Sequence, residues 1–337
     1  MPVLLISQRE VNRLLPMRDC IEAMAEAMTL LAQGKVVLPL RQVLPIPGRR
    51  AGLATMPAAA GAPMGLGVKV IAVFPNNRGT PYDAHQGAVL LFDPDHGALR
   101  AIVDASEITA IRTAAVSGLA TRLLAREDAG DLAILGAGVQ ARTHLDAMLA
   151  VRRIRRVRVW SHTQESRDRF AEYEGQRHGI PIESVASVQS TVAGADLICT
   201  VTSAREPILR GKWIEPGAHV NAVGACVRTQ RELDTRAVQS ARLFVDDRHA
   251  ALQEAGDILI PMAEGVFGDE HIVGEIGAVL TGAVAGRAHG QEITLFKSLG
   301  LAVQDLAAAS LVYRRAVDRE LGTWVDLGGE RPASPST

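Results

Sequence analysis

Apolar positions along the chain follow two different periods, which divide it into regions. Over residues 20–33 apolar side chains recur at helical spacing and Gly34 follows, which predicts a helix that ends at a glycine. A short strand is expected before it, at residues 3–6. Residues 36–99 instead show short apolar runs interrupted by Pro and Gly, which predicts an antiparallel sheet. Its clearest hairpin turn is DPDHG, residues 93–97.

Strands and helices alternate from residue 131 to about residue 260, which predicts a doubly wound parallel sheet. The expected strands cover residues 132–135, 157–160, 197–201, 219–223 and 243–245. A helix over residues 106–125, with Ser106 as its cap, comes before this region. A helical segment near residues 275–280 and a long helix with an apolar stripe over 303–317 come after it, and residues 328–337 are expected to be disordered.

A chain that begins a sheet, inserts an alternating region and finishes with a helix suggests a discontinuous first domain. The expected fold class is α/β, a Rossmann-type doubly wound parallel sheet inserted into a second α+β domain. The expected second domain covers residues 1–117 and 291–337, and the Rossmann domain covers residues 118–290.

The segment that joins the first parallel strand to its helix reads GAGVQA, residues 136–141. Gly136 permits the tight turn, Gly138 lets a pyrophosphate approach the backbone, and Ala141 keeps the helix close to the strand. Unpaired N–H groups at the helix N-terminus would face the phosphates. A glycine turn needed only for packing is the alternative, and the strand-turn-helix setting favours a dinucleotide site.

The second parallel strand ends in Trp160 and is followed by Ser161, His162 and Thr163. NAD-specific sites usually place an acid here to bind the ribose 2′-hydroxyl, and the first acid in this segment is Glu165. The three side chains can instead donate hydrogen bonds to a 2′-phosphate, so NADP(H) is favoured and NAD(H) is possible. Alternatively, they only cap the next helix.

Two cations lie in apolar surroundings. Lys69 sits in the middle of an expected strand, between Gly67 and Ile71, and either extends to solvent or occupies a pocket with an anion. Arg112 lies at the N-terminal end of the apolar stripe of the helix over 106–125. It is either a structural arginine that reaches solvent or a guanidinium directed at a carboxylate, which suits its fork geometry.

Composition excludes several other classes of protein. The 337 residues are 47% hydrophobic and 22% charged with a formal net charge of -1, which favours neither nucleic acid nor a membrane. The arginine-rich segment 152–158 lacks interleaved aromatics and is interpreted as a solvated connection. Cys20, Cys199 and Cys226 have no C-x-x-C spacing, so neither disulfides nor a metal site is expected. No signal peptide or membrane span is expected, and the protein is interpreted as cytoplasmic.

Several segments resemble the ornithine cyclodeaminase and mu-crystallin family. They are TMPAA (55–59), GVKVIAVFPNN (67–77), HQGAVLLFDP (85–94), RTAAVS (112–117), RELD (231–234) and FKSLGLAVQD (296–305). The resemblance implies a Rossmann domain inserted into a second domain whose sheet forms the interface of a homodimer. It also implies a small-molecule substrate, a 2-imino or 2-amino carboxylate held by basic residues opposite the nicotinamide.

The resemblance assigns site residues by position. Arg41, Lys69 and Arg112 would hold the carboxylate, with Lys69 and Arg112 as the catalytic residues, and Met56, Cys226 and Gly300 would contact the substrate. Together with the glycine motif, the resemblance implies that the cofactor contacts are His85, Arg112, Gly136, Ala137, Gly138, Val139, Gln140, Ala141, Ser161, His162, Thr163, Thr202, Ser203, Val223 and Ser298. For His85 the alternative is a core histidine bonded to backbone.

Two departures from the family pattern bear on the activity. Ornithine cyclodeaminases carry an Asp where this chain has Cys226, and a Glu where it has Ala54. The resemblance therefore implies the ketimine reductase branch, with NAD(P)H-dependent reduction of 1-pyrroline-2-carboxylate or 1-piperideine-2-carboxylate to L-proline or L-pipecolate. The remaining alternatives are ornithine or lysine cyclodeaminase, alanine dehydrogenase-like or opine-type reduction, and a non-enzymatic NADPH-binding protein.

Overall fold

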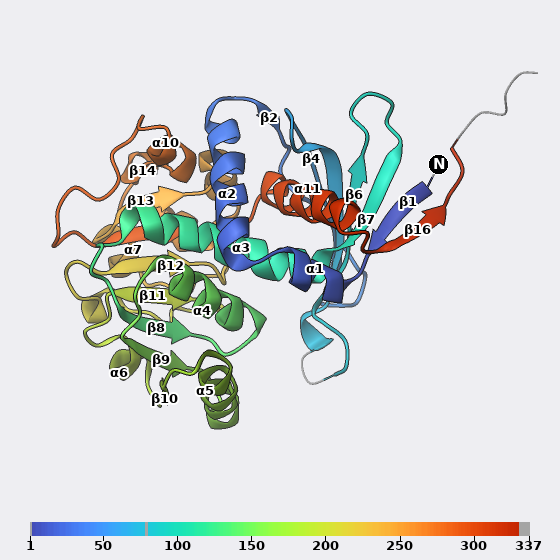
Figure 1. The fold of residues 1–337 in the computed structure, drawn as a ribbon. Coiled ribbons are helices and arrows are strands. Elements are labelled where there is room, and N and C mark those ends of the chain that lie inside the picture. Colours follow the sequence, from blue (N-terminus) through green and yellow to red (C-terminus); the bar gives the residue numbers. More distant parts are fainter. Residues whose placement is uncertain (1, 78–79, 330–337) are drawn as a thin grey trace, which may run out of the picture. The chain divides into compact units, whose positions relative to one another are not determined.

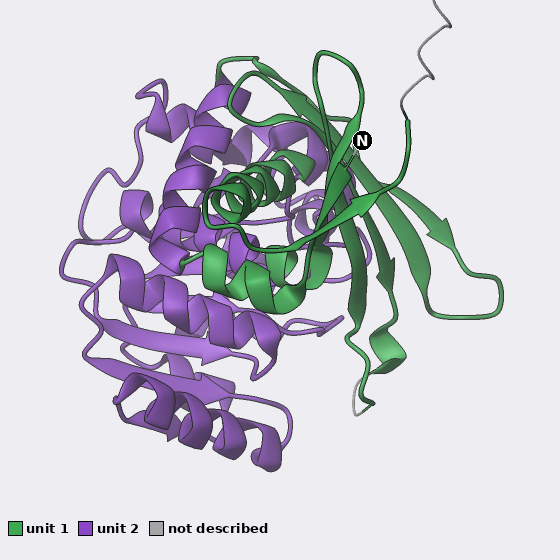
Figure 2. Ribbon diagram, turned by 45° about the vertical axis from the view of Figure 1, so that its right-hand side comes forward, with its two compact units in different colours: residues 1–16, 33–109, 302–337 green, residues 17–32, 110–301 purple. Residues whose placement is uncertain are grey.

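The chain, in a computed structural model that describes residues 2–77 and 80–329, forms two compact units (Figure 2). Unit 1 comprises residues 1–16, 33–109 and 302–337, and unit 2 comprises residues 17–32 and 110–301. The disorder expected near the C-terminus concerns mainly residues 330–337, which lie outside the described residues.

Unit 1 is built on a sheet with the strand order β16-β1-β7-β6-β5-β4-β2, in which β3 also pairs with β4 (Figure 1). The strands are β1 (Pro2–Ile6), β2 (Val36–Val37), β3 (Gln42–Pro45), β4 (Gly52–Ala60), β5 (Gly65–Val73), β6 (His85–Phe92), β7 (Leu99–Asp104) and β16 (Thr323–Asp326). Pairing is antiparallel from β2 to β7, as predicted, and only the β1–β7 pair within this sheet is parallel. The hairpin at Asp93 is confirmed, because its carboxylate accepts the N–H groups of Asp95 and His96.

The two faces of this sheet differ. The face that carries Gly67, Lys69 and Ile71 is buried, and α11 (Ala302–Asp318) packs against it over β4, β5 and β6. On the opposite face Leu53 and Leu66 are 39% and 38% exposed. Side chains of β5 thus alternate between a covered and a partly exposed face, and the lysine lies on the covered one. α1 (Gln8–Leu14) and the 3-10 turn η1 (Pro75–Asn77) complete the regular elements described in unit 1.

Unit 2 contains a parallel sheet with the order β10-β9-β8-β11-β12-β15-β13-β14 (Figure 1). Its strands are β8 (Asp131–Leu135), β9 (Arg156–Trp160), β10 (Ile182–Ser184), β11 (Leu197–Thr200), β12 (His219–Ala222), β13 (Arg242–Val245), β14 (Ile272–Glu275) and β15 (Thr294–Lys297). Its helices are α2 (Met17–Ala32), α4 (Val139–Val151), α5 (Gln164–His178), α6 (Val188–Val192), α7 (Thr235–Gln239), α8 (Arg248–Glu254), α9 (Gly256–Ala263) and α10 (Ile276–Leu280), with short turns η2 (Gly211–Trp213) and η3 (Asp269–His271). All five predicted strands and the α/β fold class are confirmed.

The unit boundaries differ from those expected from the sequence. They lie at 109/110 and 301/302 instead of 117/118 and 290/291, and residues 17–32 belong to unit 2. The first boundary falls inside a single long helix, α3 (Ala105–Leu124). Strand β15 pairs between β12 and β13, which brings the segment before residue 302 into the parallel sheet. α2 joins unit 2 because it packs against α4 and α10.

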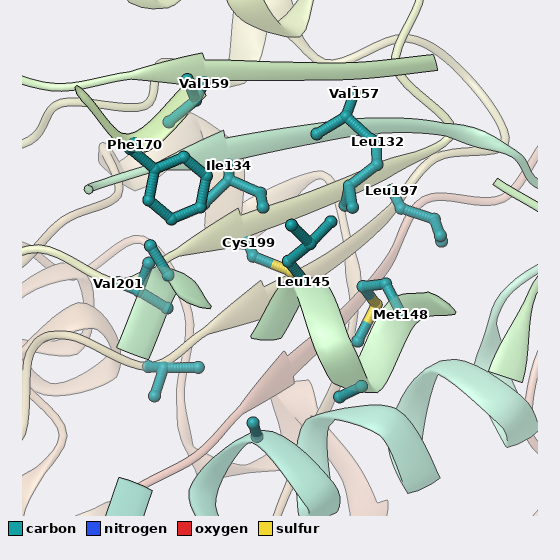
Figure 3. Close-up of a cluster of buried hydrophobic side chains, with 14 of the residues drawn as sticks. Leu132, Ile134, Leu145, Met148, Val157, Val159, Phe170, Leu197, Cys199 and Val201 are labelled. Atoms are coloured by element: carbon teal, nitrogen blue, oxygen red, sulfur yellow. The ribbon is translucent and has the colours of Figure 1, made fainter. Parts of the chain in front are cut away.

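A cluster of buried apolar side chains lies beside strands β8, β9 and β11 of unit 2 (Figure 3). Leu145 and Met148 of α4 and Phe170 of α5 pack against side chains of β8, β9 and β11. The strand side chains in this cluster include Leu132, Ile134, Val157, Val159, Leu197 and Cys199. Burying one such leucine contributes roughly 1.5–3 kcal/mol, so Leu145→Ala would cost about 2–5 kcal/mol once the cavity is included.

The arginine-rich connection after α4 is structural, and its interpretation as solvated is wrong for two members. Arg152 donates to the carbonyls of Thr121 and Ala125 at 2.8 and 3.0 Å and so caps the last turn of α3. Arg158 is only 2% exposed, donates to the Ala193 carbonyl and pairs with Asp131. These side chains satisfy backbone carbonyls that would otherwise lack partners.

The cap expected for α3 is also wrong. The carboxylate of Asp104, the last residue of β7, accepts the N–H of Glu107 at 2.8 Å, as an N-cap does. The hydroxyl of Ser106 instead donates to the His85 carbonyl at 2.6 Å. Asp104 was overlooked because it ends a strand and caps a helix with no loop between them.

Candidate dinucleotide and substrate site

The turn from β8 into α4 has the geometry that the motif predicts. Gly136 has φ +128, and a Cβ added to it would lie 2.8 Å from the Val201 carbonyl oxygen, so only glycine fits. Around Gly138, by contrast, an added Cβ would meet nothing within 4 Å. Ala141 is fully buried in the core between helix and strand. Packing therefore explains Gly136 and Ala141, whereas the space at Gly138 suits a ligand.

Two buried polar atoms lie near the strand ends without a hydrogen-bond partner among the described residues. They are the hydroxyl of Ser298, directly after β15, and the side-chain carbonyl of Gln140, in the first turn of α4. Buried polar groups are nearly always satisfied, so each is a candidate contact for a bound molecule. With the N–H groups at the start of α4, these residues fit a dinucleotide whose pyrophosphate lies at the helix N-terminus.

The turn after β9 divides its three polar residues between two roles. Thr163 is the N-cap of α5 and accepts the N–H of Ser166, while its hydroxyl donates to Ser166 Oγ at 2.8 Å. The helix-capping alternative therefore accounts for Thr163. Ser161 is half-buried and His162 is exposed ahead of that cap, so both remain accessible to the adenosine half of a dinucleotide.

Arg112 is buried within unit 2, at 4% exposure, which excludes the alternative of a guanidinium that reaches solvent. A Cβ added to Gly300, which has φ +79, would collide with that guanidinium. Gly300 therefore lets the arginine lie directly against the backbone after β15. The structure brings these two expected substrate residues together.

Lys69 is 3% exposed within unit 1, so the solvent alternative is wrong for it as well. Its ammonium pairs with Asp305 at 2.7 Å and lies 3.4 Å from the Thr109 hydroxyl. Met56, another expected substrate residue, is the β4 partner directly opposite Lys69. Asp305, at the start of α11, is 1% exposed, so the pair is a buried ion pair in which each charge compensates the other.

The remaining expected residues occupy different positions. Arg41 is half-buried just before β3. His85 is exposed at the first residue of β6, so the core alternative is wrong. Cys226 is half-buried after β12, and its thiol donates to the Val223 carbonyl at 3.4 Å. Burial raises the pKa of Cys199 to about 12 and the pKa of Cys20 still further, so those two thiols are inert.

Sequence reasoning missed four buried acids that support these residues. They are Glu232, Asp246, Asp257 and Asp305. Asp246 accepts the N–H groups of Leu299 and Gly300 at 2.7 and 2.9 Å and so fixes the loop that faces Arg112. Glu232 and Asp305 lie inside RELD and FKSLGLAVQD, two segments already singled out for their resemblance to the family, and that position was the available signal.

Over residues 2–77 and 80–329, no three or more His, Cys, Asp or Glu side chains are grouped so that they could hold a metal ion. Within the same residues no helix is both long and apolar enough to cross a membrane.

A parallel sheet whose carboxyl ends carry a glycine turn, an open helix N-terminus and unsatisfied buried polar atoms defines a Rossmann-type dinucleotide-binding protein. The chain belongs to the ornithine cyclodeaminase/mu-crystallin family, whose model matches residues 2–320. The family assignment made from the sequence is thus confirmed.

Three relatives illustrate the similarity. Ketimine reductase mu-crystallin of Mus musculus is 44% identical over 281 residues, which cover 83% of this chain and 85% of the relative. Δ1-Pyrroline-2-carboxylate reductase of Thermococcus litoralis, solved in complex with NADH and L-proline, matches with a TM-score of 0.93 and 38% identity, over 95% of this chain and 99% of that one. An archaeal alanine dehydrogenase dimer with bound NAD matches with a TM-score of 0.91 and 30% identity, over 97% and 100%.

Proposed function

We propose that this protein reduces cyclic ketimines, 1-pyrroline-2-carboxylate or 1-piperideine-2-carboxylate, to L-proline or L-pipecolate with NAD(P)H. The observation that carries the proposal is the contrast between the buried Arg112, a partner for a carboxylate, and the uncharged Cys226, which offers no acid for a second amine. A relative that binds NADH and L-proline and a ketimine reductase relative support the same reaction.

The chemistry that a nicotinamide would supply when bound is hydride donation to C2 of the imine. The guanidinium of Arg112 holds the substrate carboxylate, which orients C2 for attack. Lys69 is the second proposed catalytic residue, as the resemblance implies. A protonated imine is already electrophilic, so the protein needs no strong general acid, and the product is the secondary amine. Asp305 fixes the direction of the Lys69 ammonium through their 2.7 Å ion pair.

NADPH is the proposed preferred donor, with NADH as the second. The segment between β9 and α5 places Ser161 and His162 where an NAD-specific site carries an acid. A ratio of kcat/KM values in favour of NADPH supports this assignment. A preference of tenfold or more for NADH contradicts it.

We propose in addition that the protein acts as a homodimer. The sheet face opposite α11 carries Leu53 and Leu66 at more than a third exposure, next to the half-buried Val68 and Val70. An apolar face of this kind is typical of an interface between copies, and an alanine dehydrogenase relative is a dimer. Light scattering after gel filtration should give twice the chain mass, and Leu66→Glu should reduce it.

The deciding experiment is a substrate panel run with both nicotinamides. It contains the two cyclic imines, pyruvate with ammonia, other 2-keto acid and amine mixtures, and ornithine or lysine with NAD. The proposal expects kcat/KM for a cyclic imine to exceed every other value by at least about tenfold. Faster turnover of pyruvate with ammonia indicates an alanine dehydrogenase, ammonia release from ornithine indicates a cyclodeaminase, and NADPH binding without turnover indicates a binding protein.

A further inference from the structure

The carboxylate of Glu232 is buried where strands β11 and β12 end. One of its oxygens accepts the N–H and the hydroxyl of Thr202, at 2.7 and 2.6 Å. The other accepts the Thr200 hydroxyl and the Gly224 N–H, at 2.8 and 2.7 Å. A single fully buried side chain therefore ties the loops after two neighbouring strands to each other.

Both oxygens of Glu232 act as hydrogen-bond acceptors. Each oxygen of Glu232 receives one backbone N–H, from Thr202 or from Gly224, and a backbone N–H can only donate. A glutamine of nearly the same size would turn its amino group against one of these N–H groups. The Glu232 carboxylate also lies too close to Gly224 for any side chain there, because a Cβ added to Gly224 would lie 2.5 Å from one of its oxygens.

Further buried charges hold the backbone of Glu232. Asp257 accepts the N–H groups of Glu232 and Leu233 at 2.8 and 3.0 Å, and its other oxygen pairs with Lys297 at 2.9 Å. Lys297 is the last residue of β15, the strand beside β12. Burial raises the pKa of Glu232, and the charge of Asp257 raises it further, against the Thr202 hydrogen bonds and Lys297. Glu232 is therefore an acid buried at an electrostatic cost, where strands β11, β12 and β15 end.

The loop held by Glu232 also packs against the glycine turn after β8. Val201 lies between Thr200 and Thr202, and its carbonyl oxygen is the atom that a Cβ on Gly136 would meet at 2.8 Å. A shift of the Thr202 loop would therefore change the space at the turn after β8. In doubly wound sheets the ligand lies in the crevice outside the carboxyl ends of the strands, and these two loops form its walls.

We propose that Glu232 is a positioning residue, whose carboxylate fixes the loops after β11 and β12 in the arrangement that receives the nicotinamide half of the dinucleotide. It acts through Thr202 and Gly224 and does not contact the cofactor itself. The inference rests on the proposed function as far as a dinucleotide binds at this edge, and it holds whichever imine is reduced.

The test compares Glu232→Gln with Glu174→Gln in the full-length protein. Glu174 is a matched control because it is also a buried glutamate of unit 2, at 2% exposure, but it lies in α5 and pairs with Arg177 at 2.9 Å. NADH and NADPH are titrated by fluorescence, steady-state rates are measured by cofactor oxidation, and the midpoint of thermal unfolding is recorded. We expect Glu232→Gln to raise the Kd of the preferred nicotinamide by about tenfold or more and to lower kcat, with Glu174→Gln within about twofold of wild type in both.

If Glu232 had a purely structural role, both variants would unfold at a lower midpoint and bind the nicotinamide with the same Kd. A folded Glu232→Gln with a wild-type Kd therefore overturns the proposal. Thr200→Val removes the hydroxyl that donates to Glu232 at 2.8 Å, at a position not assigned to the cofactor, and it should raise Kd by roughly threefold. That variant decides the question if Glu232→Gln does not fold, and a wild-type Kd then overturns the proposal. A wild-type protein that binds a nicotinamide but reduces no imine refutes the proposed function alone, whereas one that binds neither nicotinamide refutes both.

Discussion

The two sheets of this protein present functional groups in different ways. In unit 2, every strand of the parallel sheet ends at the same edge, and the candidate ligand contacts there are backbone groups and small side chains in the loops. In unit 1, the antiparallel sheet presents Lys69 from the middle of β5, on the face covered by α11. A parallel sheet thus offers an edge for a ligand, and an antiparallel one offers a face.

The support behind the functional groups differs in the same way. At the edge in unit 2, the buried acids Glu232 and Asp246 accept backbone N–H groups and so hold loops. On the face in unit 1, Asp305 pairs with a side-chain ammonium and so holds one charge. Glu232 and Asp246 thus position main chain in unit 2, whereas Asp305 positions a side chain in unit 1. Four predictions test this difference.

The largest effect is expected at the ion pair of unit 1. Lys69→Met leaves Asp305 buried without the lysine charge and should lower the free energy of unfolding by about 3–5 kcal/mol, measured by urea denaturation. Adding Asp305→Asn to this variant should restore part of that loss, because the buried anion is removed. A double variant no more stable than Lys69→Met would show that the ion pair does not cause the loss.

Arg112→Ala should lower kcat/KM for 1-pyrroline-2-carboxylate by about a hundredfold, since it removes a charge-assisted fork worth roughly 3 kcal/mol. Arg112→Lys keeps the charge without the fork and should fall between Ala and wild type. Steady-state kinetics at saturating cofactor, with the Kd of NADPH as a control for folding, provide the measurement. An unchanged KM and kcat in Arg112→Ala would refute the carboxylate clamp.

Acid should destabilise unit 2 through its buried histidines. Burial lowers the pKa of His144 to about 4, against the hydrogen bond to the Gln140 carbonyl, which raises it, and the other ring nitrogen bonds the Ser117 hydroxyl. Because the folded pKa lies below the unfolded value of about 6.5, its stabilising contribution is present above pH 6.5 and is lost as the pH falls toward 4. The loss is on the order of 2–3 kcal/mol.

Urea unfolding at pH 7 and pH 4.5 checks this prediction, with His144→Gln losing less stability between the two pH values than wild type. His219 of unit 2 shifts in the same direction, to about 3, while His85 and His96 of unit 1 are exposed. If wild type and His144→Gln lost equal stability between the two pH values, the acid sensitivity would come from groups other than His144.

The smallest expected effect on stability concerns Gly138, which should respond to substitution differently from Gly136 in the same turn from β8 into α4. Gly138→Ala should leave the free energy of unfolding of the cofactor-free protein within about 0.5 kcal/mol and raise the Kd of the nicotinamide about tenfold, because the new methyl group enters open space. Gly136→Ala should lower stability itself, given its φ of +128 and the close Val201 carbonyl. If both variants lost stability equally, the space at Gly138 would have a packing role.

Prediction from sequence succeeded for elements whose pattern is local. The strands β8, β9, β11, β12 and β13 are apolar runs followed by turn residues, and each was located. β15 was missed because its segment, TLFK, has only two apolar residues, between a threonine and a lysine. The expected domain boundary at 290/291 differs from the unit boundary at 301/302 for the same reason, since pairing of that strand assigns the segment to unit 2.

The candidate site likewise has one part that the sequence determined locally and another that only folding brings together. Six consecutive residues, 136–141, determine the dinucleotide turn, so the sequence alone identified it, and the resemblance carried the assignment of Lys69 and Arg112. The partner of Lys69 lies far along the chain at Asp305, and the donors to Glu232 come from three separate positions. A backbone turn depends on neighbouring residues, whereas a buried charge depends on what folding brings beside it, and only the tertiary structure decides that.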